Sequence, residues 1–262
     1  MINLITHFYN EEYLLPFWIE WHKRLPLDSV TLIDYASTDR SAEIVKELAP
    51  KHWKLIPSRN ADFCAAACDA EVMDIERSLG GWKLALNTTE FLMIPSNNIV
   101  ERLNSYGAQA VFCKSVGIAG SDNQDPQNIK EFMSAFDTGY MNSIVESVGP
   151  NSVNRSNRII HNSLCGFYSA GRHDTELTSR IESDSIFIGW AGYYPWNQNT
   201  IKRKLQIKDR IPEHNKLRLW GEQHQWPLEK MTSVREEIIS NSSNLLNFQL
   251  YNNTYQHCLS LL

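Results

Sequence analysis

The sequence predicts an α/β fold in which helices cover both faces of a mostly parallel central sheet. Three observations predict it. Over about the first hundred residues, short apolar segments typical of buried strands alternate with amphipathic helical segments, the connections are short, and polar residues follow each strand. Because parallel strands need a long crossover connection, usually a helix, this alternation favours parallel pairing.

Hydrophobic periodicity places the strands and helices of the first half. Strands are expected at residues 2–8, 30–34, 53–57 and 82–87. Helices are expected after an N-cap at Asn10, at residues 42–48 and at residues 61–79. Gly80 and Gly81 follow the last of these helices and are typical of a C-terminal stop.

The second half is less regular, and we expect one domain with two functional halves. Strands are expected at residues 110–116 and 186–190, and a helix at residues 198–206. Polar composition predicts loops at residues 120–128, 151–161 and 212–225, and a loosely packed tail over the last dozen residues or so. The boundary between the two halves of the domain, residues 1–262, falls at about residue 115.

The composition excludes several classes of protein. A formal net charge of −5, without a long run of Lys or Arg, predicts no nucleic-acid partner and no binding to an anionic membrane surface. No segment approaches the ~18 apolar residues of a membrane-spanning helix, and the N-terminus lacks the basic region of a signal peptide. Five cysteines without tight spacing are typical of reduced thiols. We therefore expect a cytoplasmic protein, with a peripheral position at the inner membrane face as the alternative.

Polar side chains follow each of the four N-terminal strands. They are Asn10 and Glu11, then Asp34 and Ser37, then Arg59, and finally Asn87, Thr89 and Glu90. The carboxyl ends of parallel strands meet at one edge of a sheet, where ligands bind, so these residues predict a ligand site. Asp34 could accept hydrogen bonds from a ribose hydroxyl or a base N–H, or it could stabilise the following turn.

Two segments carry a family resemblance: Phe-Tyr-Asn-Glu-Glu-Tyr-Leu-Leu at residues 8–15, and Leu-Ile-Asp-Tyr-Ala-Ser-Thr-Asp at residues 32–39. With Trp-His at residues 21–22, they resemble the opening of family-2-type glycosyltransferases with the GT-A fold. They are most similar to a small bacterial branch with an N-E-x-x-L-L start and a D-x-x-S-T-D second strand. The resemblance covers about the first hundred residues. It implies a Rossmann-type α/β/α sandwich and nucleotide-binding roles for Tyr9, Asn10, Glu11 and Asp34. It also implies that about residues 1–115 bind a nucleotide-sugar and about residues 116–262 bind the acceptor.

The fourth strand departs from the family pattern at its metal-binding motif. Members usually carry D-x-D-E-F-L there, and the resemblance implies that both aspartates hold a divalent cation against the donor diphosphate. This chain has Asn-Thr-Thr at residues 87–89, followed by the retained Glu-Phe-Leu at residues 90–92. Amide and hydroxyl oxygens alone would bind Mg²⁺ weakly. Three alternatives stay open: transfer without a metal, Mn²⁺ or Mg²⁺ held weakly by Glu90, Asp69 or His224, and a binding-only protein.

A leaving diphosphate needs its charge compensated by a metal, by Arg or Lys side chains, or by backbone N–H groups. Basic residues beyond the first hundred positions are the candidates without a metal: Arg155, Arg158, Arg172, Lys202, Arg203 and Lys204. His224 lies in a segment that looks similar to the one from which many GT-A enzymes direct a late histidine toward the diphosphate. It is therefore a further candidate for donor binding.

Transfer to an acceptor hydroxyl also needs a base for the proton. His173 and Asp174 lie in a loop that begins with glycine and are candidates, with a solvated loop as the alternative. Glu90 is the third candidate, although a Glu at a strand end can cap the following turn. Trp196 and Trp220 stand in polar surroundings and could stack on sugar rings.

The sequence therefore predicts a glycosyltransferase that moves a sugar from a nucleotide-diphosphate sugar to a carbohydrate or lipid-linked acceptor, in the assembly of cell-surface glycans. A non-catalytic nucleotide- or glycan-binding module on a degenerate transferase scaffold is the alternative. A nucleotidyltransferase would carry a Gly-rich, basic loop after the first strand. The segment Tyr-Asn-Glu-Glu at residues 9–12 has neither feature.

Overall fold

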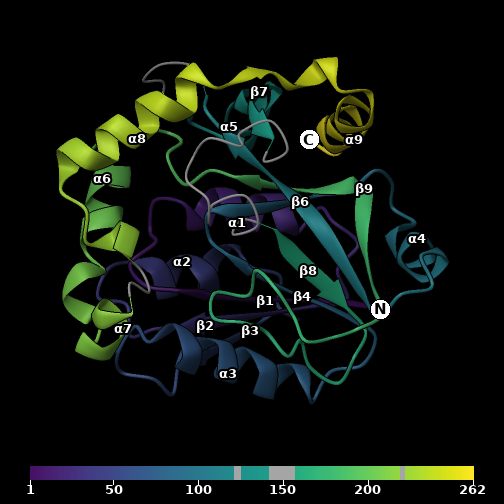
Figure 1. Cartoon of the computed structure of the whole chain (residues 1–262), viewed down its shortest axis with the longest axis horizontal. Coiled ribbons are helices and arrows are strands. Elements are labelled where there is room, and N and C mark those ends of the chain that lie inside the picture. Colours follow the sequence, from purple (N-terminus) through teal and green to yellow (C-terminus); the bar gives the residue numbers. More distant parts are fainter. Residues whose placement is uncertain (121–124, 142–156, 219–221) are drawn as a thin grey trace.

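A computed structural model describes residues 1–120, 125–141, 157–218 and 222–262, and a sheet of ten strands organises these residues (Figure 1). The first half alternates strands and helices: β1 (Ile2–Phe8), α1 (Leu15–His22), β2 (Ser29–Asp34), α2 (Ser41–Leu48), β3 (Lys54–Pro57), α3 (Ala65–Glu76) and β4 (Trp82–Asn87). The strands predicted at residues 2–8 and 82–87 have the observed bounds, and the other elements of this half differ by a few residues.

The first four strands form the parallel part of the sheet, in the order β3-β2-β1-β4. Phe8 of β1 pairs with Asp34 of β2, and His7 of β1 pairs with Asn87 of β4. The carboxyl ends of these three strands therefore lie side by side at one edge.

Side chains along the parallel strands alternate between two apolar layers. Leu4 and Leu32 belong to the cluster that includes the buried side chains of α1 and α2. Ile5 and Ile33 point the other way and pack with Val72 of α3. In Figure 1, α2 lies above these strands and α3 lies below them. The predicted α/β class, with helices on both faces of a mostly parallel central sheet, is confirmed.

The second half continues the same sheet with mixed pairing. Its strands are β5 (Glu90–Met93), β6 (Ala110–Ile118), β7 (Thr138–Met141), β8 (Arg158–His161), β9 (Arg180–Trp190) and β10 (Ser243–Asn244). Its α-helices are α4 (Ile99–Ser105), α5 (Ile129–Ser134), α6 (Gln198–Leu205), α7 (Glu213–Leu217), α8 (Leu228–Ser240) and α9 (Gln249–Ser260). Short 3₁₀ turns are η1 (Ala135–Asp137), η2 (Lys208–Arg210), η3 (Glu222–His224) and η4 (Leu245–Asn247). Strand β8 pairs antiparallel with both β4 and β6, which brings the second half against the parallel half.

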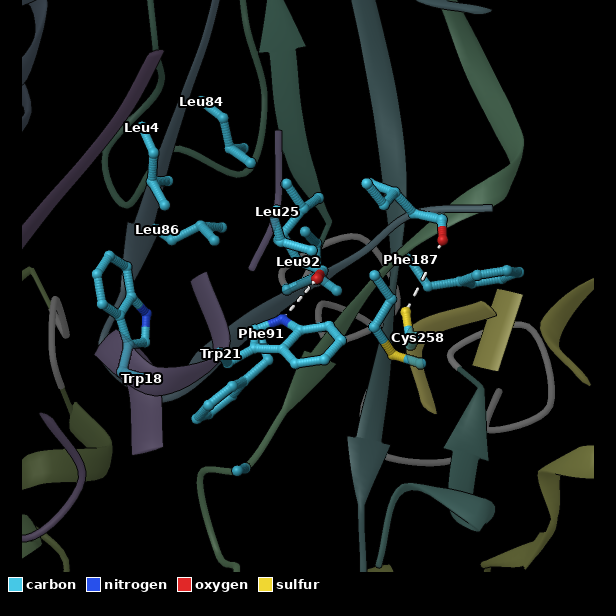
Figure 2. Packing of buried hydrophobic residues seen from close by; sticks show 14 of the residues in the cluster. Leu4, Trp18, Trp21, Leu25, Leu84, Leu86, Phe91, Leu92, Phe187 and Cys258 are labelled. Carbon is cyan, nitrogen blue, oxygen red and sulfur yellow. Dashed lines mark hydrogen bonds between the residues drawn. The ribbon is translucent and has the colours of Figure 1, made fainter. Parts of the chain in front are cut away.

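Helix α1 anchors β5 through its aromatic side chains. The indole Nε1 of Trp18 donates to the carbonyl oxygen of Glu90 at 3.0 Å. The indole Nε1 of Trp21 donates to the carbonyl oxygen of Leu92 at 2.8 Å (Figure 2). His22 Nε2 accepts from the Leu92 N–H, so its Nδ1 carries the proton and donates to the Trp18 carbonyl oxygen at 2.8 Å. Burial lowers the pKa of His22 to about 3, and the ring stays neutral.

Several predictions for loops and tails are wrong. Residues 158–161 form β8, residues 213–217 form α7, and the end of the chain forms α9 instead of a loose tail. In α9, Tyr251 and Cys258 are fully buried, and the Tyr251 hydroxyl donates to the Phe136 carbonyl oxygen at 2.6 Å. The apolar residues of α9 recur at helical spacing, which is the signal that a reading based on polar composition overlooks.

The remaining sequence-level expectations concern membranes and cysteines. Within the described ranges, no helix is long and apolar enough to cross a membrane. The five cysteines are thiols, and four of them are buried. This agrees with the expectation of reduced cysteines.

Candidate functional site

A cavity of about 120 Å³ lies at the carboxyl ends of β1, β2 and β4. Strand ends and the segments around α3, α6 and η3 line it: His7, Phe8, Tyr9, Glu11, Tyr35, Phe63, Asn87, Thr88, Thr89, Arg203, Ile207 and His224. Figure 1 shows α6 and α7 at this end of the sheet, opposite to the N-terminus. Sites that enclose whole small molecules usually measure ~300–1,000 Å³, so this cavity can enclose only part of a large ligand.

Five of the predicted binding residues line the cavity, namely Tyr9, Glu11, Asn87, Thr89 and His224. They come from the loop after β1, the turn after β4 and the late turn η3. Positions 215 residues apart in the sequence thus meet in one space, since the cavity extends from Tyr9 to His224.

Asn10, Asp34 and Ser37 join the loops that follow β1 and β2. Asn10 has a left-handed backbone (φ 51°), and its Oδ1 accepts a hydrogen bond from the Thr38 N–H at 2.7 Å. The Asn10 N–H donates to Ser37 Oγ at 3.0 Å, and the Ser37 N–H donates to Asp34 Oδ1 at 2.9 Å. Asn10 is therefore not the N-cap of α1. Asp34 Oδ1 stabilises the turn after β2, which is one of the two roles predicted for this residue.

Aromatic rings give the cavity apolar walls. The Arg210 guanidinium lies over the Tyr9 ring, with its carbon 3.9 Å from the ring centroid. Arg210 also donates to the Tyr35 carbonyl oxygen at 2.8 Å, which fastens η2 to the end of β2. On the other side, Phe63 meets His224 edge to face, with ring centroids 5.7 Å apart. Such rings can pack against the plane of a base or the apolar face of a sugar.

Glu11 and Arg203 form a buried but incomplete ion pair in the cavity wall. Arg203 Nη1 lies 3.4 Å from Glu11 Oε1, and Arg203 Nη2 lies 3.3 Å from the Gly192 carbonyl oxygen. Charge-assisted hydrogen bonds are normally ~2.7–2.9 Å long, so both contacts are weak. Among the described residues, neither Glu11 Oε2 nor Arg203 Nε has a hydrogen-bond partner. Burial raises the pKa of Glu11, and Arg203 opposes that shift.

The neutral triplet after β4 lies against a second arginine. Arg172 Nη2 donates to Asn87 Oδ1 at 2.9 Å, and Arg172 Nη1 donates to Asp69 Oδ1 at 2.6 Å. Asp69 and Arg172 are both at least 95% buried. The first residue of the neutral triplet, Asn87, thus contacts a buried guanidinium, and Asp69 is the carboxylate that holds this guanidinium in place.

Glu90 lies in a saturated ion pair with Arg158. Arg158 donates to both Glu90 carboxylate oxygens, from Nε at 2.8 Å and from Nη2 at 2.6 Å. Glu90 Oε2 also accepts the Asn87 N–H at 2.7 Å, and the carboxylate is 4% exposed. A carboxylate engaged in this way does not line the cavity and is poorly placed to accept a proton from a substrate. The geometry instead gives Glu90 the task of shaping the turn after β4.

Three further candidates lie away from the cavity. His173 is half-buried, and its Nδ1 lies 3.2 Å from Nη1 of Arg158. Asp174 is exposed and pairs with Arg180 at 3.1 Å. Arg59 is exposed and pairs at 2.5 Å with a carboxylate on α3. The structure therefore brings none of these three side chains to the cavity wall.

Burial, assisted by neighbouring arginine and lysine side chains, lowers several pKa values around the cavity. Burial, assisted by Arg172, holds the pKa of His7 well below its usual range. Burial, assisted by Arg203, does the same for Lys204. Burial together with Lys204 and Arg203 lowers the pKa of His224 to about 4. An anion bound beside Arg203 would offset part of the positive charge that these side chains meet.

The residues at the cavity do not fit a hard divalent cation. Within the described ranges, no group of three or more His, Cys, Asp or Glu side chains is arranged to hold a metal ion. Glu90 and Asp69 are each paired with an arginine, and the Asn87 oxygen faces a guanidinium. Mg²⁺ and Mn²⁺ prefer carboxylate oxygens, and the one carboxylate among the described residues that line the cavity, Glu11, lies beside the guanidinium of Arg203.

Sequence reasoning missed some residues and could not separate others. His7 was missed because it lies within the apolar run of β1, although its register opposite Asn87 places it at the cavity. Arg203 was one of six basic candidates, and the exposed Lys202 beside it has the same chemistry in the sequence. Trp196 packs on Tyr193, with ring centroids 5.6 Å apart. Arg155 and Trp220 lie outside the described residues.

Comparisons with known proteins add little beyond the architecture. No protein-family model and no curated protein sequence matches the chain. A mannosyltransferase from Pyrobaculum calidifontis, solved with GDP-mannose and Mn²⁺, is similar over 99% of this chain and 84% of its own, with 12% identity and a TM-score of 0.44. A 4-diphosphocytidyl-2C-methyl-D-erythritol synthase from Anaerococcus prevotii is similar over 62% of this chain and 70% of its own, with 8% identity and a TM-score of 0.33. Likenesses at this level do not determine the activity of this chain.

Proposed function

We propose that the protein is a glycosyltransferase that binds the diphosphate of a nucleotide-sugar in the cavity at the ends of β1, β2 and β4. The observation that carries the proposal is the meeting of polar strand ends, aromatic walls and the loosely held guanidinium of Arg203 in one space. The sugar would pass to a hydroxyl of a carbohydrate or lipid-linked acceptor, in the assembly of cell-surface glycans.

The chemistry needs one bond to form as another breaks. The acceptor hydroxyl oxygen would bond to the anomeric carbon while the bond from that carbon to the phosphate oxygen breaks. The nucleoside diphosphate leaves with the electron pair, and the hydroxyl proton passes to a base. The titratable carboxyl and imidazole groups in the cavity wall are His7, Glu11 and His224, so the base is expected among these and not at Glu90.

The test is release of nucleotide from a panel of nucleotide-sugars, with glycan and lipid-linked acceptors, in EDTA and in Mn²⁺. The variant Thr89→Phe fills the cavity wall and should abolish release, whereas Thr178→Phe at an exposed position should leave it intact. Thermal unfolding of both variants checks that they are folded.

A binding-only protein is the second candidate, because the predicted base Glu90 is saturated by Arg158. Binding of nucleoside diphosphates without release from any donor, on any acceptor, would favour that candidate. Absence of both binding and release would contradict the whole proposal.

A further inference from the structure

Arg203 is a buried guanidinium whose hydrogen-bonding capacity is largely unused. It lines the cavity and is 8% exposed, and its hydrogen bonds to other described residues are two long contacts, to Glu11 and to Gly192. A guanidinium offers five N–H donors, and leaving a buried donor unsatisfied costs about 1–3 kcal/mol. Arg203 therefore has donors left for an acceptor that the described part of the chain does not supply.

Glu11 is the matching half of this arrangement. Its Oε2 has no hydrogen-bond partner among the described residues, and its Oε1 is 3.4 Å from Arg203. A buried carboxylate held this loosely neutralises the charge of the arginine without accepting hydrogen bonds from most of its N–H groups. An anion that offered two oxygens to Arg203 would replace the contact to Glu11 with shorter, bidentate hydrogen bonds.

In the neutral triplet at residues 87–89, the Asn87 side chain already contacts an arginine. Arg172 contacts Asn87 at 2.9 Å and is locked by Asp69 at 2.6 Å. Asp69 neutralises this guanidinium, but the hydrogen bond from Arg172 engages the Asn87 oxygen that a cation would otherwise use. The cavity thus has a guanidinium in its wall and another behind the neutral triplet.

Resting on the proposed function, we infer that Arg203 binds the diphosphate of the donor directly, and that this residue serves in place of a divalent cation. Arg203 contacts Glu11 in the structure, and the diphosphate would displace Glu11 on binding. As the sugar leaves, the guanidinium stabilises the negative charge that grows on the phosphate oxygens. Binding and turnover would then proceed without a metal.

The test is calorimetric titration of the whole chain with inorganic pyrophosphate, in EDTA and in Mn²⁺. The wild type should bind in EDTA, with an affinity that Mn²⁺ leaves within about twofold. Arg203→Gln should weaken binding by about ten- to a hundredfold. Glu11→Gln should strengthen it by about two- to fivefold, because it removes the competing charge. Arg77→Gln breaks an exposed ion pair with Asp74 at the C-terminal end of α3. This variant is the matched control and should bind as the wild type does.

Opposite effects at the two members of one ion pair separate ligand exchange from a folding defect, which would weaken binding in both variants. Arg203→Lys, which keeps the charge but loses bidentate geometry, should lie between the wild type and Arg203→Gln, and it remains informative if Arg203→Gln does not fold. Unchanged binding in Arg203→Gln, weaker binding in Glu11→Gln, or binding only with Mn²⁺ would overturn the role of Arg203 and leave the proposed function standing. If the wild type binds neither pyrophosphate nor any nucleoside diphosphate, both fail together.

Discussion

The Glu90–Arg158 pair and the Glu11–Arg203 pair are both buried at the same end of the sheet, and they differ in how completely they are satisfied. Arg158 contacts both oxygens of Glu90 at 2.6–2.8 Å, and the pair is shielded behind the turn after β4. Arg203 contacts one oxygen of Glu11 at 3.4 Å, in the wall of the cavity. A saturated pair has no capacity left for a ligand, so it stabilises the fold. An unsaturated pair leaves donors and an acceptor available, so it marks where a ligand binds.

The largest expected effect follows from breaking the saturated pair. Arg158→Met leaves the Glu90 carboxylate buried without its partner, and we expect the free energy of unfolding to fall by about 3–5 kcal/mol. Urea denaturation at pH 7 measures it. A loss below about 1 kcal/mol would mean that the pair is not structural, and the contrast with Glu11 would disappear.

Acidification should lower the free energy of unfolding through His22, which accepts a hydrogen bond from β5, the strand that begins at Glu90. Its pKa is about 3 in the folded protein against about 6.5 when unfolded, so the unfolded chain binds the proton more readily. The stability that His22 contributes is complete above about pH 6.5 and is lost as the pH falls toward 3. Between pH 7 and pH 4 the loss should be about 3 kcal/mol. A His22→Gln variant should show a flatter pH dependence of its urea midpoint, and an unchanged profile would contradict this.

A smaller loss of stability is expected when Asn10 is substituted, in the loop that carries Glu11 of the unsaturated pair. Asn10→Ala removes the acceptor for the Thr38 N–H and places alanine at a φ of 51°, and we expect a loss of about 1–2 kcal/mol. Asn10→Gly removes the same acceptor without the backbone strain, so it should lose less. Urea denaturation of the two variants separates the two causes. Equal losses would mean that the backbone strain is negligible.

The smallest expected change in stability is at the unsaturated pair itself. Because Glu11 and Arg203 hold each other weakly, Glu11→Gln should change the free energy of unfolding by less than about 1 kcal/mol, which is well below the effect of Arg158→Met. The same urea experiment gives both numbers. A Glu11→Gln loss as large as that of Arg158→Met would show that the two pairs are alike.

Local pattern predicts the parallel half of the fold well. Each strand there is an apolar run, because helices bury both of its faces, and each helix repeats its apolar residues at helical spacing. The second half is harder because its elements depend on distant partners. Strand β8 is the four-residue segment Arg158–His161, and it becomes a strand by pairing with β4 and β6 on either side. Because the four residues of β8 begin with Arg and end with His, they give no local signal for a strand.

The candidate site divides in the same way. The convergence of Glu11, Asn87 and Thr89 follows from parallel topology, and the sequence could anticipate it. Which arginine meets which carboxylate could not be anticipated, since Glu90 and Arg158 are separated by 68 positions, and Glu11 and Arg203 by 192. The sequence therefore predicts which strand ends gather but not the pairing that makes Glu90 structural.

The most direct measurement is a crystal structure of the protein soaked, in separate crystals, with UDP and with GDP in the presence of Mn²⁺. We expect the diphosphate in the cavity between Tyr9 and Thr89, with phosphate oxygens in bidentate contact with Arg203 and with Glu11 displaced. A diphosphate bound elsewhere, or one bridged to Asn87 and Thr89 by a manganese ion while Arg203 stays on Glu11, would contradict the account.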